Sequence, residues 1–118
     1  MSSFEDLADC PSLFSGPLAQ EPAERIGTAL KVLADPARLR LLSQIASEPS
    51  GEACVCTLNG PLNLQQPTVS PHLKVLYGAG LLDRDRRGLW VYYRLIPGRL
   101  QSLERLLCEQ PVAVAATG

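Results

Sequence analysis

The sequence predicts a mainly α-helical (α+β) domain that carries one β-hairpin, and three observations support this prediction. Apolar residues recur at helical spacing from Ile26 to Leu33 and again in the residues after Pro36. Two strand-like runs, LLDRDR and LWVYYRL, meet at Arg87 and Gly88, a pair that favours a tight turn. The 118 residues, 46% of them apolar, are enough for one domain with a small core.

Capping residues and prolines set the order of the predicted elements. Asp35 and Pro36 are typical of an N-cap followed by a first-turn proline, and Pro67 occupies a similar first-turn position. Gly78 and Gly80 end the helix that Pro67 begins. The predicted helices span residues 24–33, 36–47, 56–62, 67–77 and 100–107, and the predicted strands span residues 81–86 and 89–95.

Charge is segregated along the chain, although the net charge is only −1. Residues 1–24 contain five acidic and no basic residues, whereas residues 72–99 contain six Lys or Arg against two Asp. A local basic surface on an acidic protein attracts phosphate groups, because phosphates respond to the local potential.

Short helices, a basic hairpin and a closing helix match the winged helix-turn-helix plan, in which the second helix of the motif enters the DNA major groove. The candidate reader is the segment QQPTVSPHLKVL, whose polar side chains can hydrogen-bond base edges or phosphates. A capped amphipathic surface helix is the alternative, and the arginines of the hairpin favour DNA binding over it. The candidate DNA-binding residues are Gln65, Gln66, Thr68, Ser70, His72, Lys74, Arg84, Arg86 and Arg87.

The segments ADPARLRLLSQIA, CVC and QPTVSPHLKVLYGAGLLDRDRRGLWVYYRL, in this order, resemble the ArsR/SmtB family of metal-responsive winged-helix repressors. The resemblance covers residues 24–108. It implies a homodimer built on the first and last helices, which binds an inverted-repeat operator in double-stranded DNA and leaves it when an ion binds. Two residues depart from the family's pattern. Pro71 stands inside the reader, and Asn59 stands where arsenic sensors of the C-V-C-x-x-C type carry a third thiol.

The chain divides into three predicted parts. Residues 1–23, which are acidic and contain several prolines, predict a flexible, extended arm that carries Cys10. Residues 24–109 form the winged helix-turn-helix domain for DNA binding and dimerisation, and residues 110–118 form a tail. The N-terminus has no basic region before an apolar stretch, and no window approaches the ~20 apolar residues that cross a bilayer. We therefore expect a cytoplasmic protein with no membrane partner.

Cys54 and Cys56 flank a single valine. In a reducing compartment, four cysteines indicate metal binding, redox chemistry or simple burial rather than a disulfide framework. Residues i and i+2 of an α-helix point ~200° apart, whereas in an extended chain they share a face. The two thiols can therefore share an ion only where the backbone is extended or the start of a helix unwinds. Ligation would then be coupled to the helix that leads into the DNA reader.

Trivalent arsenic or antimony favours three sulfurs, so a third thiol must come from elsewhere. Cys10 on the arm can reach the CVC segment of the other protomer, and the resemblance to family members with an N-terminal cysteine implies such a role. Cys108 is the competitor, but its place in an apolar last helix predicts a buried structural thiol. The predicted metal ligands are Cys10, Cys54 and Cys56.

Soft thiolates select soft ions, so As(III) or Sb(III) is the expected inducer and Cd(II) or Pb(II) is the alternative. Zinc, nickel and cobalt usually require imidazole, and the chain has one histidine, which we expect to be a hydrogen-bonded helix residue. A disulfide between Cys54 and Cys56 that responds to peroxide is the redox alternative. There is no Gly-rich phosphate loop and no nucleophile–base arrangement, so we expect neither an enzyme nor a small organic substrate.

Overall fold

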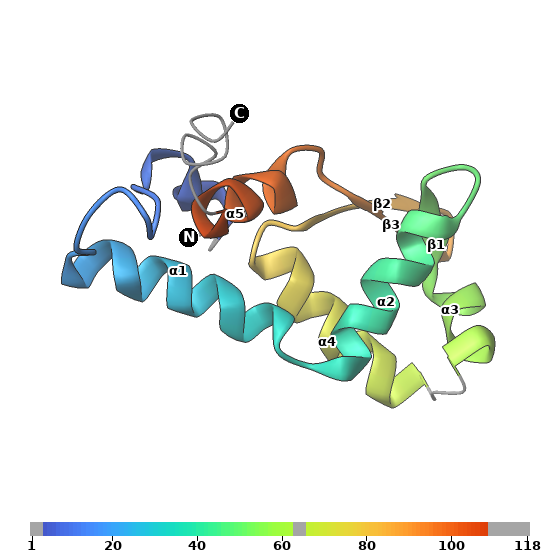
Figure 1. Ribbon diagram of the computed structural model, residues 1–118. Coiled ribbons are helices and arrows are strands. Elements are labelled where there is room, and N and C mark those ends of the chain that lie inside the picture. The colour runs from blue at the N-terminus through green and yellow to red at the C-terminus, as the bar shows by residue number, and fades with distance from the viewer. Residues whose placement is uncertain (1–3, 63–65, 109–118) are drawn as a thin grey trace, which may run out of the picture.

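The computed structural model describes residues 4–62 and 66–108, which form helices around a small antiparallel sheet (Figure 1). The elements, in chain order, are the 3-10 helix η1 (Glu5–Asp9), α1 (Gln20–Leu33), α2 (Pro36–Ser47), β1 (Glu52–Cys54), α3 (Val55–Leu62), α4 (Gln66–Gly78), β2 (Leu82–Arg87), β3 (Trp90–Leu95) and α5 (Arg99–Leu107). The predicted fold class, mainly α with a β-hairpin, is confirmed.

The turn between α1 and α2 forms the predicted N-cap. The Asp35 carboxylate accepts hydrogen bonds from the backbone N–H groups of Ala37, at 2.9 Å, and Arg38, at 3.3 Å. The Arg38 side chain donates to the Val32 carbonyl oxygen at 2.7 Å and to His72 Nδ1 at 3.3 Å. This turn therefore ties the end of α1 to α4, the predicted reader.

Helix α4 continues through Pro71, which lies on its exposed side. A proline has no N–H to donate, but few intrahelical bonds are lost within the first turn and a half of a helix. The opposite side carries Val69, Leu73 and Leu76, which are fully buried in the core. The helix thus presents a polar side away from the core.

The strands β2 and β3 form the predicted hairpin, which turns at Gly88, where φ is +64°. Glycine adopts this left-handed conformation without the steric cost that other residues incur. Strand β1, which the sequence analysis did not predict, pairs with the other edge of β3, so the strand order is β1-β3-β2. Three residues are too few to show the alternation by which a strand is recognised. The pairing places Cys54 opposite Tyr92.

The N-terminal segment packs on the domain, where the sequence predicted a flexible, extended arm. Leu7 of η1 is fully buried, and Phe4 and Cys10 on either side of it are also buried. The Phe4 N–H donates to the Ala79 carbonyl oxygen at 3.0 Å. The three apolar residues are spaced three apart, which places them on one face of a 3-10 helix. The prolines of this segment all follow η1, so they do not oppose it.

The other helices lie close to their predicted bounds. Helix α1 begins at Gln20, four residues before the predicted start, because a proline such as Pro22 is tolerated in the first turn of a helix. Within residues 4–62 and 66–108, no helix is both long and apolar enough to cross a membrane.

We expect Asp35→Ala to lower the free energy of unfolding more at neutral pH than in acid. The backbone N–H of Arg38, followed by that of Ala37, holds the pKa of the Asp35 carboxyl below its ordinary value of 3.8. Because the folded-state pKa is lowered, the carboxylate stabilises the folded state above pH 3.8, and this contribution disappears as the pH falls through the folded-state pKa. Urea denaturation at neutral pH and near pH ~2 measures the difference.

The matched control is Asp35→Asn, which keeps a good N-cap without the charge. Its unfolding midpoint at neutral pH should lie closer to that of the original protein than the midpoint of Asp35→Ala does. Equal losses in the two variants would contradict the capping role of the side chain.

Candidate thiol site and nucleic-acid interface

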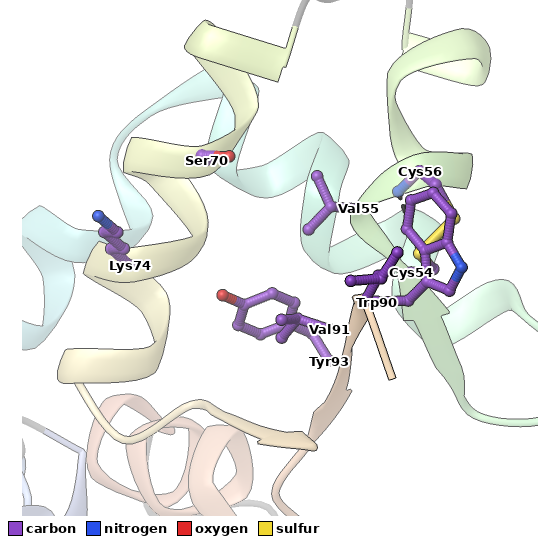
Figure 2. A pocket seen from close by; sticks show the side chains of 9 residues that line it. Cys54, Val55, Cys56, Ser70, Lys74, Trp90, Val91 and Tyr93 are labelled. Carbon is purple, nitrogen blue, oxygen red and sulfur yellow. Dashed lines mark hydrogen bonds between the residues drawn. A yellow bond between two sulfur atoms is a disulfide. The ribbon is translucent and has the colours of Figure 1, made fainter. Parts of the chain in front are cut away.

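Cys54 and Cys56 lie at a junction between a strand and a helix, since β1 ends at Cys54 and α3 begins at Val55. Their Cα atoms are 5.1 Å apart, and the structure joins the two sulfurs in a disulfide (Figure 2). The extended backbone at Cys54 allows two side chains that would diverge within a helix to converge. This is the geometric condition that the sequence analysis set for two thiols that share one ion.

The start of α3 depends on the sulfur of Cys54. The backbone N–H of Cys56 donates to Cys54 Sγ at 3.2 Å, and the Thr57 hydroxyl donates to the Cys54 carbonyl oxygen at 2.9 Å. Cys54 thus caps α3 in the way that Ser or Asp caps other helices. Cys54 is only 3% exposed, whereas Cys56 is exposed to solvent. A ligand that arrives from solvent meets Cys56 first, and its bond to Cys54 changes the cap of α3.

A hollow of about 240 Å³ joins the sulfur pair to α4 and to the hairpin (Figure 2). Cys54, Val55 and Cys56 line it on one side, and Ser70 and Lys74 of α4 line it on another. The hairpin supplies the remaining lining residues, which are mostly apolar: Leu89, Trp90, Val91 and Tyr93. The thiol pair, the predicted reader and the hairpin therefore border one space.

The predicted reader residues that the structure describes differ in their surroundings. They are Thr68, Ser70, His72 and Lys74, while Gln66 opens α4 and Gln65 lies outside the described residues. Lys74 is exposed and Ser70 is half-buried, and both border the hollow. His72 accepts the hydrogen bond from α2 described above, so it is the hydrogen-bonded helix residue that we expected. The polar side of α4 is thus continuous with the hollow beside the thiols.

Two hairpin arginines lie on the sheet face that is turned toward α4. Cross-strand pairing places Arg84 opposite Tyr93 and Arg86 opposite Val91, so all four side chains share this face. The Arg84 guanidinium stacks 4.0 Å from the centre of the Tyr77 ring of α4. Arg86 is exposed, and it forms no ion pair with any residue in the described part of the chain. Among the three candidate arginines of the hairpin, Arg86 therefore has the charge that is most available to a phosphate.

Arg87 is held on the other face of the sheet. Two of its nitrogens donate to the carboxylate of Glu52, at 2.6 Å and 3.0 Å, and Nε donates to Asp85 at 3.0 Å. The guanidinium also lies 4.5 Å from the centre of the Tyr92 ring. The hydrogen bonds to Glu52 and then Asp85 raise the pKa of Arg87 above its ordinary value. Arg87 thus joins β1 to the hairpin, and two carboxylates offset its charge.

The other two cysteines differ from their predicted surroundings. Cys10 is 8% exposed within the core cluster, and its Sγ donates to the Asp6 carbonyl oxygen at 3.7 Å. Cys108 follows α5 and is exposed, so the prediction of a buried structural thiol is wrong. Figure 1 shows the N-terminal segment and α5 at one end of the molecule and β1 and α3 at the other. The described residues contain no group of three or more His, Cys, Asp or Glu side chains placed to hold a metal.

The wall of the hollow and the ionic contact behind it were not predicted from the sequence. The second strand was predicted, but nothing indicated that Trp90 borders the cysteines. That contact depends on the pairing of β1 with β3, which three residues could not reveal. The acidic Glu52 beside a CVC segment, with arginines in the hairpin, was the one available signal for this pairing.

Helices α3 and α4, followed by the β2–β3 hairpin, define a winged helix-turn-helix protein. Residues 35–84 match the family described as bacterial regulatory protein, arsR family. The chain is 35% identical over 80 residues to the arsenical resistance operon repressor of Bacillus subtilis, a match that covers 66% of this chain and 74% of that protein. The chain belongs to the ArsR family, whose members are transcriptional regulators and not enzymes.

Two further relatives extend the comparison. The arsenic resistance transcriptional regulator ArsR1 of Pseudomonas putida is 48% identical over 77 residues, which are 65% of this chain and 59% of the length of that relative. The crystal structure of AntR, an antimony-specific transcriptional repressor, superimposes on this chain with a TM-score of 0.64. The two sequences are 31% identical, and the match covers 87% of this chain and 90% of the AntR chain. The family resemblance seen in the sequence motifs is therefore confirmed.

We expect Cys10 to react with iodoacetamide much more slowly than Cys108 in the folded, reduced protein. Burial and the hydrogen bond to Asp6 shield the Cys10 thiol, whereas Cys108 is open to solvent. Mass spectrometry of peptides after timed alkylation measures the two rates, and denaturant should equalise them. Equal rates in the folded protein would contradict the packing of the N-terminal segment.

Proposed function

We propose that this protein is a transcriptional repressor that binds operator DNA as a homodimer and leaves it when trivalent arsenic or antimony binds Cys54 and Cys56. The observation that supports this most directly is the shared hollow, which borders the two cysteines, the reader helix and the hairpin. Relatives named for arsenic resistance and for antimony support the choice of ion. The protein acts where its DNA lies, in the cytoplasm.

In the proposed complex, α4 enters the major groove and the hairpin contacts the backbone or minor groove beside it. Thr68, Ser70 and Lys74 lie on the side of α4 that faces away from the core, with Gln66 at its start, and Gln65, the other proposed contact of this segment, lies outside the described residues. Arg86 supplies the hairpin's phosphate contact, because its charge is exposed and unpaired within the described chain. Arg84 stays near α4 by stacking on Tyr77.

Release begins at the cap of α3. When both sulfurs bind one ion, the ion fixes the distance between Cys54 Sγ and Cys56 Sγ, and the first turn of α3, which Cys54 Sγ caps, shifts with them. Coupling of this kind is typically ~1–3 kcal/mol, or about 5- to 150-fold in affinity. In a dimer the two readers lie ~34 Å apart, so one shift in each protomer misaligns two half-sites.

The dimer proposed from the family resemblance uses the first and last helices. Leu30 of α1 and Leu100 and Leu107 of α5 are 37–39% exposed, which is high for large apolar side chains. Leu103, by contrast, is 4% exposed and belongs to the core of the single chain. The exposed leucines lie on the two helices that a partner would cover.

For inorganic arsenite or antimonite, we propose Cys10 of the partner protomer as the third sulfur. Cys10 is buried here, so the N-terminal segment must unpack, which includes breaking the bond from Phe4 to Ala79. Cd(II) or Pb(II) at the same three cysteines is the alternative inducer, since these ions also prefer thiolates. Cys108 is exposed and is the competing third ligand.

The disulfide favours a second candidate function, that of a thiol-based redox regulator. In this scheme, peroxide takes one hydrogen from each thiol, so that one S–S bond and two waters form. Titrating the reduced protein on DNA with arsenite and, separately, with peroxide distinguishes the two functions. Release by peroxide alone would replace the metalloid proposal.

We expect Cys54→Ser and Cys56→Ser to bind operator DNA normally and to lose release by arsenite and antimonite. Serine preserves the size and the capping ability of the side chain, but its hydroxyl is not a soft ligand. The measurement is fluorescence anisotropy of a labelled operator, obtained by selection from random DNA, with the protein reduced. Parallel titrations with cadmium, lead and zinc rank the ions by their potency in releasing DNA.

Cys108→Ser is the matched control and should retain release. If arsenite still released the Cys54→Ser variant fully from operator DNA, the proposed site would be wrong. If arsenite released the Cys10→Ser variant as readily as the original protein, Cys10 would not be the third ligand.

We expect Arg86→Ala to weaken binding to all DNA sequences alike and to lower the slope of log affinity against log salt by ~0.9. Arg87→Ala should change the slope less, because Glu52 and Asp85 already offset that charge. Operator titrations over a range of salt concentrations measure both slopes. A larger change for Arg87→Ala than for Arg86→Ala would show that the hairpin presents its other face to DNA.

A further inference from the structure

We propose that the hollow beside Cys54 and Cys56 binds the organic group of a monosubstituted trivalent arsenical, such as methyl- or phenylarsonous acid. The inference rests on the proposed function and names a ligand class for the same two sulfurs. It starts from the number of thiols: the described residues bring two sulfurs together, and no third potential ligand joins them.

The chemistry matches a two-sulfur site. An arsonous acid, R–As(OH)₂, carries two exchangeable hydroxyl groups. With the pair in its dithiol form, two S–H and two As–O bonds break, two As–S bonds form, and the protons leave with the hydroxyls as two waters. Arsenic remains trivalent, so no oxidant is required. The third position on arsenic is already filled by carbon.

Inorganic arsenite is a poorer match to the same two sulfurs. After two exchanges it keeps one hydroxyl group, which must be replaced by a third thiol or lie against the lining of the hollow. That lining is mostly apolar next to the sulfurs, with Val55 on α3 and Trp90 and Val91 on the hairpin. A hydroxyl group gains nothing from contact with these apolar side chains, whereas an organic group gains from burial against them.

The size of the hollow fits a phenyl group. Its volume is about 240 Å³, and an apolar cavity of ~150 Å³ is sufficient to bind benzene. Figure 2 shows Val55, Val91 and Tyr93 between the sulfur pair and α4. A ring attached to arsenic at Cys54 and Cys56 would extend into this space toward Ser70. It would therefore contact Val55, Val91 and Tyr93, which lie between the sulfur pair and the reader helix.

The first test is a series of ligands on the unmodified, reduced protein bound to labelled operator DNA. We expect methyl- and phenylarsonous acid to release DNA at concentrations ~10-fold or more below that of arsenite, since an apolar group in a fitted pocket gives about 10- to 200-fold. A biphenyl arsonous acid should lose this advantage, because two rings at ~150 Å³ each exceed the volume of the hollow, about 240 Å³. Fluorescence of Trp90, the only tryptophan of the chain, reports occupation of the hollow.

The second test narrows the hollow by Val91→Phe. This variant should need at least several-fold more phenylarsonous acid for release, with a smaller change for arsenite. Leu39→Phe, on the exposed surface of α2 and outside the hollow, is the matched control and should respond like the original protein. If Val91→Phe does not fold, the ligand series on the unmodified protein still decides.

Cys10→Ser separates the two ligand classes. It should weaken release by arsenite, which needs a third sulfur, and leave release by phenylarsonous acid unchanged. Binding of the arsenical without release of DNA does not support the inference, because any close pair of thiols binds an arsonous acid. Equal potency of arsenite, methyl- and biphenylarsonous acid would overturn this inference and leave the proposed function intact. Failure of every arsenical to release DNA would overturn the proposed function itself.

Discussion

The pairing of β1 with β3 is the constraint on which the thiol site depends. It keeps the backbone extended as far as Cys54, so that the sulfurs on either side of Val55 converge. A short edge strand holds few backbone hydrogen bonds, and the structure reinforces it through Glu52. The carboxylate of Glu52 contacts Arg87 at 2.6 Å and Arg94 at 4.0 Å. Single exposed ion pairs contribute little, but a bidentate pair within a network holds its geometry better.

This constraint links the sulfurs to the DNA-binding elements from two directions. Along the chain, Cys54 caps α3, and α3 leads into α4. Across the sheet, β1 contacts the strand that carries Trp90 and Val91, whose side chains share the hollow with the cysteines. A ligand in the hollow therefore needs no long pathway through the protein, because residues of the reader and of the hairpin line the same hollow. Differential contact of this kind is what shifts an equilibrium between two states.

Much of the fold followed from local signals, whereas the site depended on pairing between distant segments. The N-cap at Asp35 and Pro36, the bounds of α4 and the turn at Gly88 each depend on a few neighbouring residues, and each was predicted. The contact of β1 with β3 joins residues some forty positions apart and leaves no periodic signal. The same limit explains Cys10 and Cys108. The burial of each thiol depends on which elements cover it. The prolines in the first part of the chain suggested an extended arm, whereas in the structure this segment packs on the domain.

The burial of Cys10 gives the two classes of arsenical different requirements. In the proposed three-sulfur site, Cys10 becomes available to an inorganic ion only when η1 leaves the core, so part of the binding free energy is spent on exposing Phe4 and Leu7. An arsenical that already carries a carbon substituent needs only Cys54 and Cys56, which converge without any such rearrangement. The relative response to the two classes therefore depends on how stably the N-terminal segment is packed. Substitutions in η1 that never touch arsenic or DNA should then alter which arsenical the protein detects.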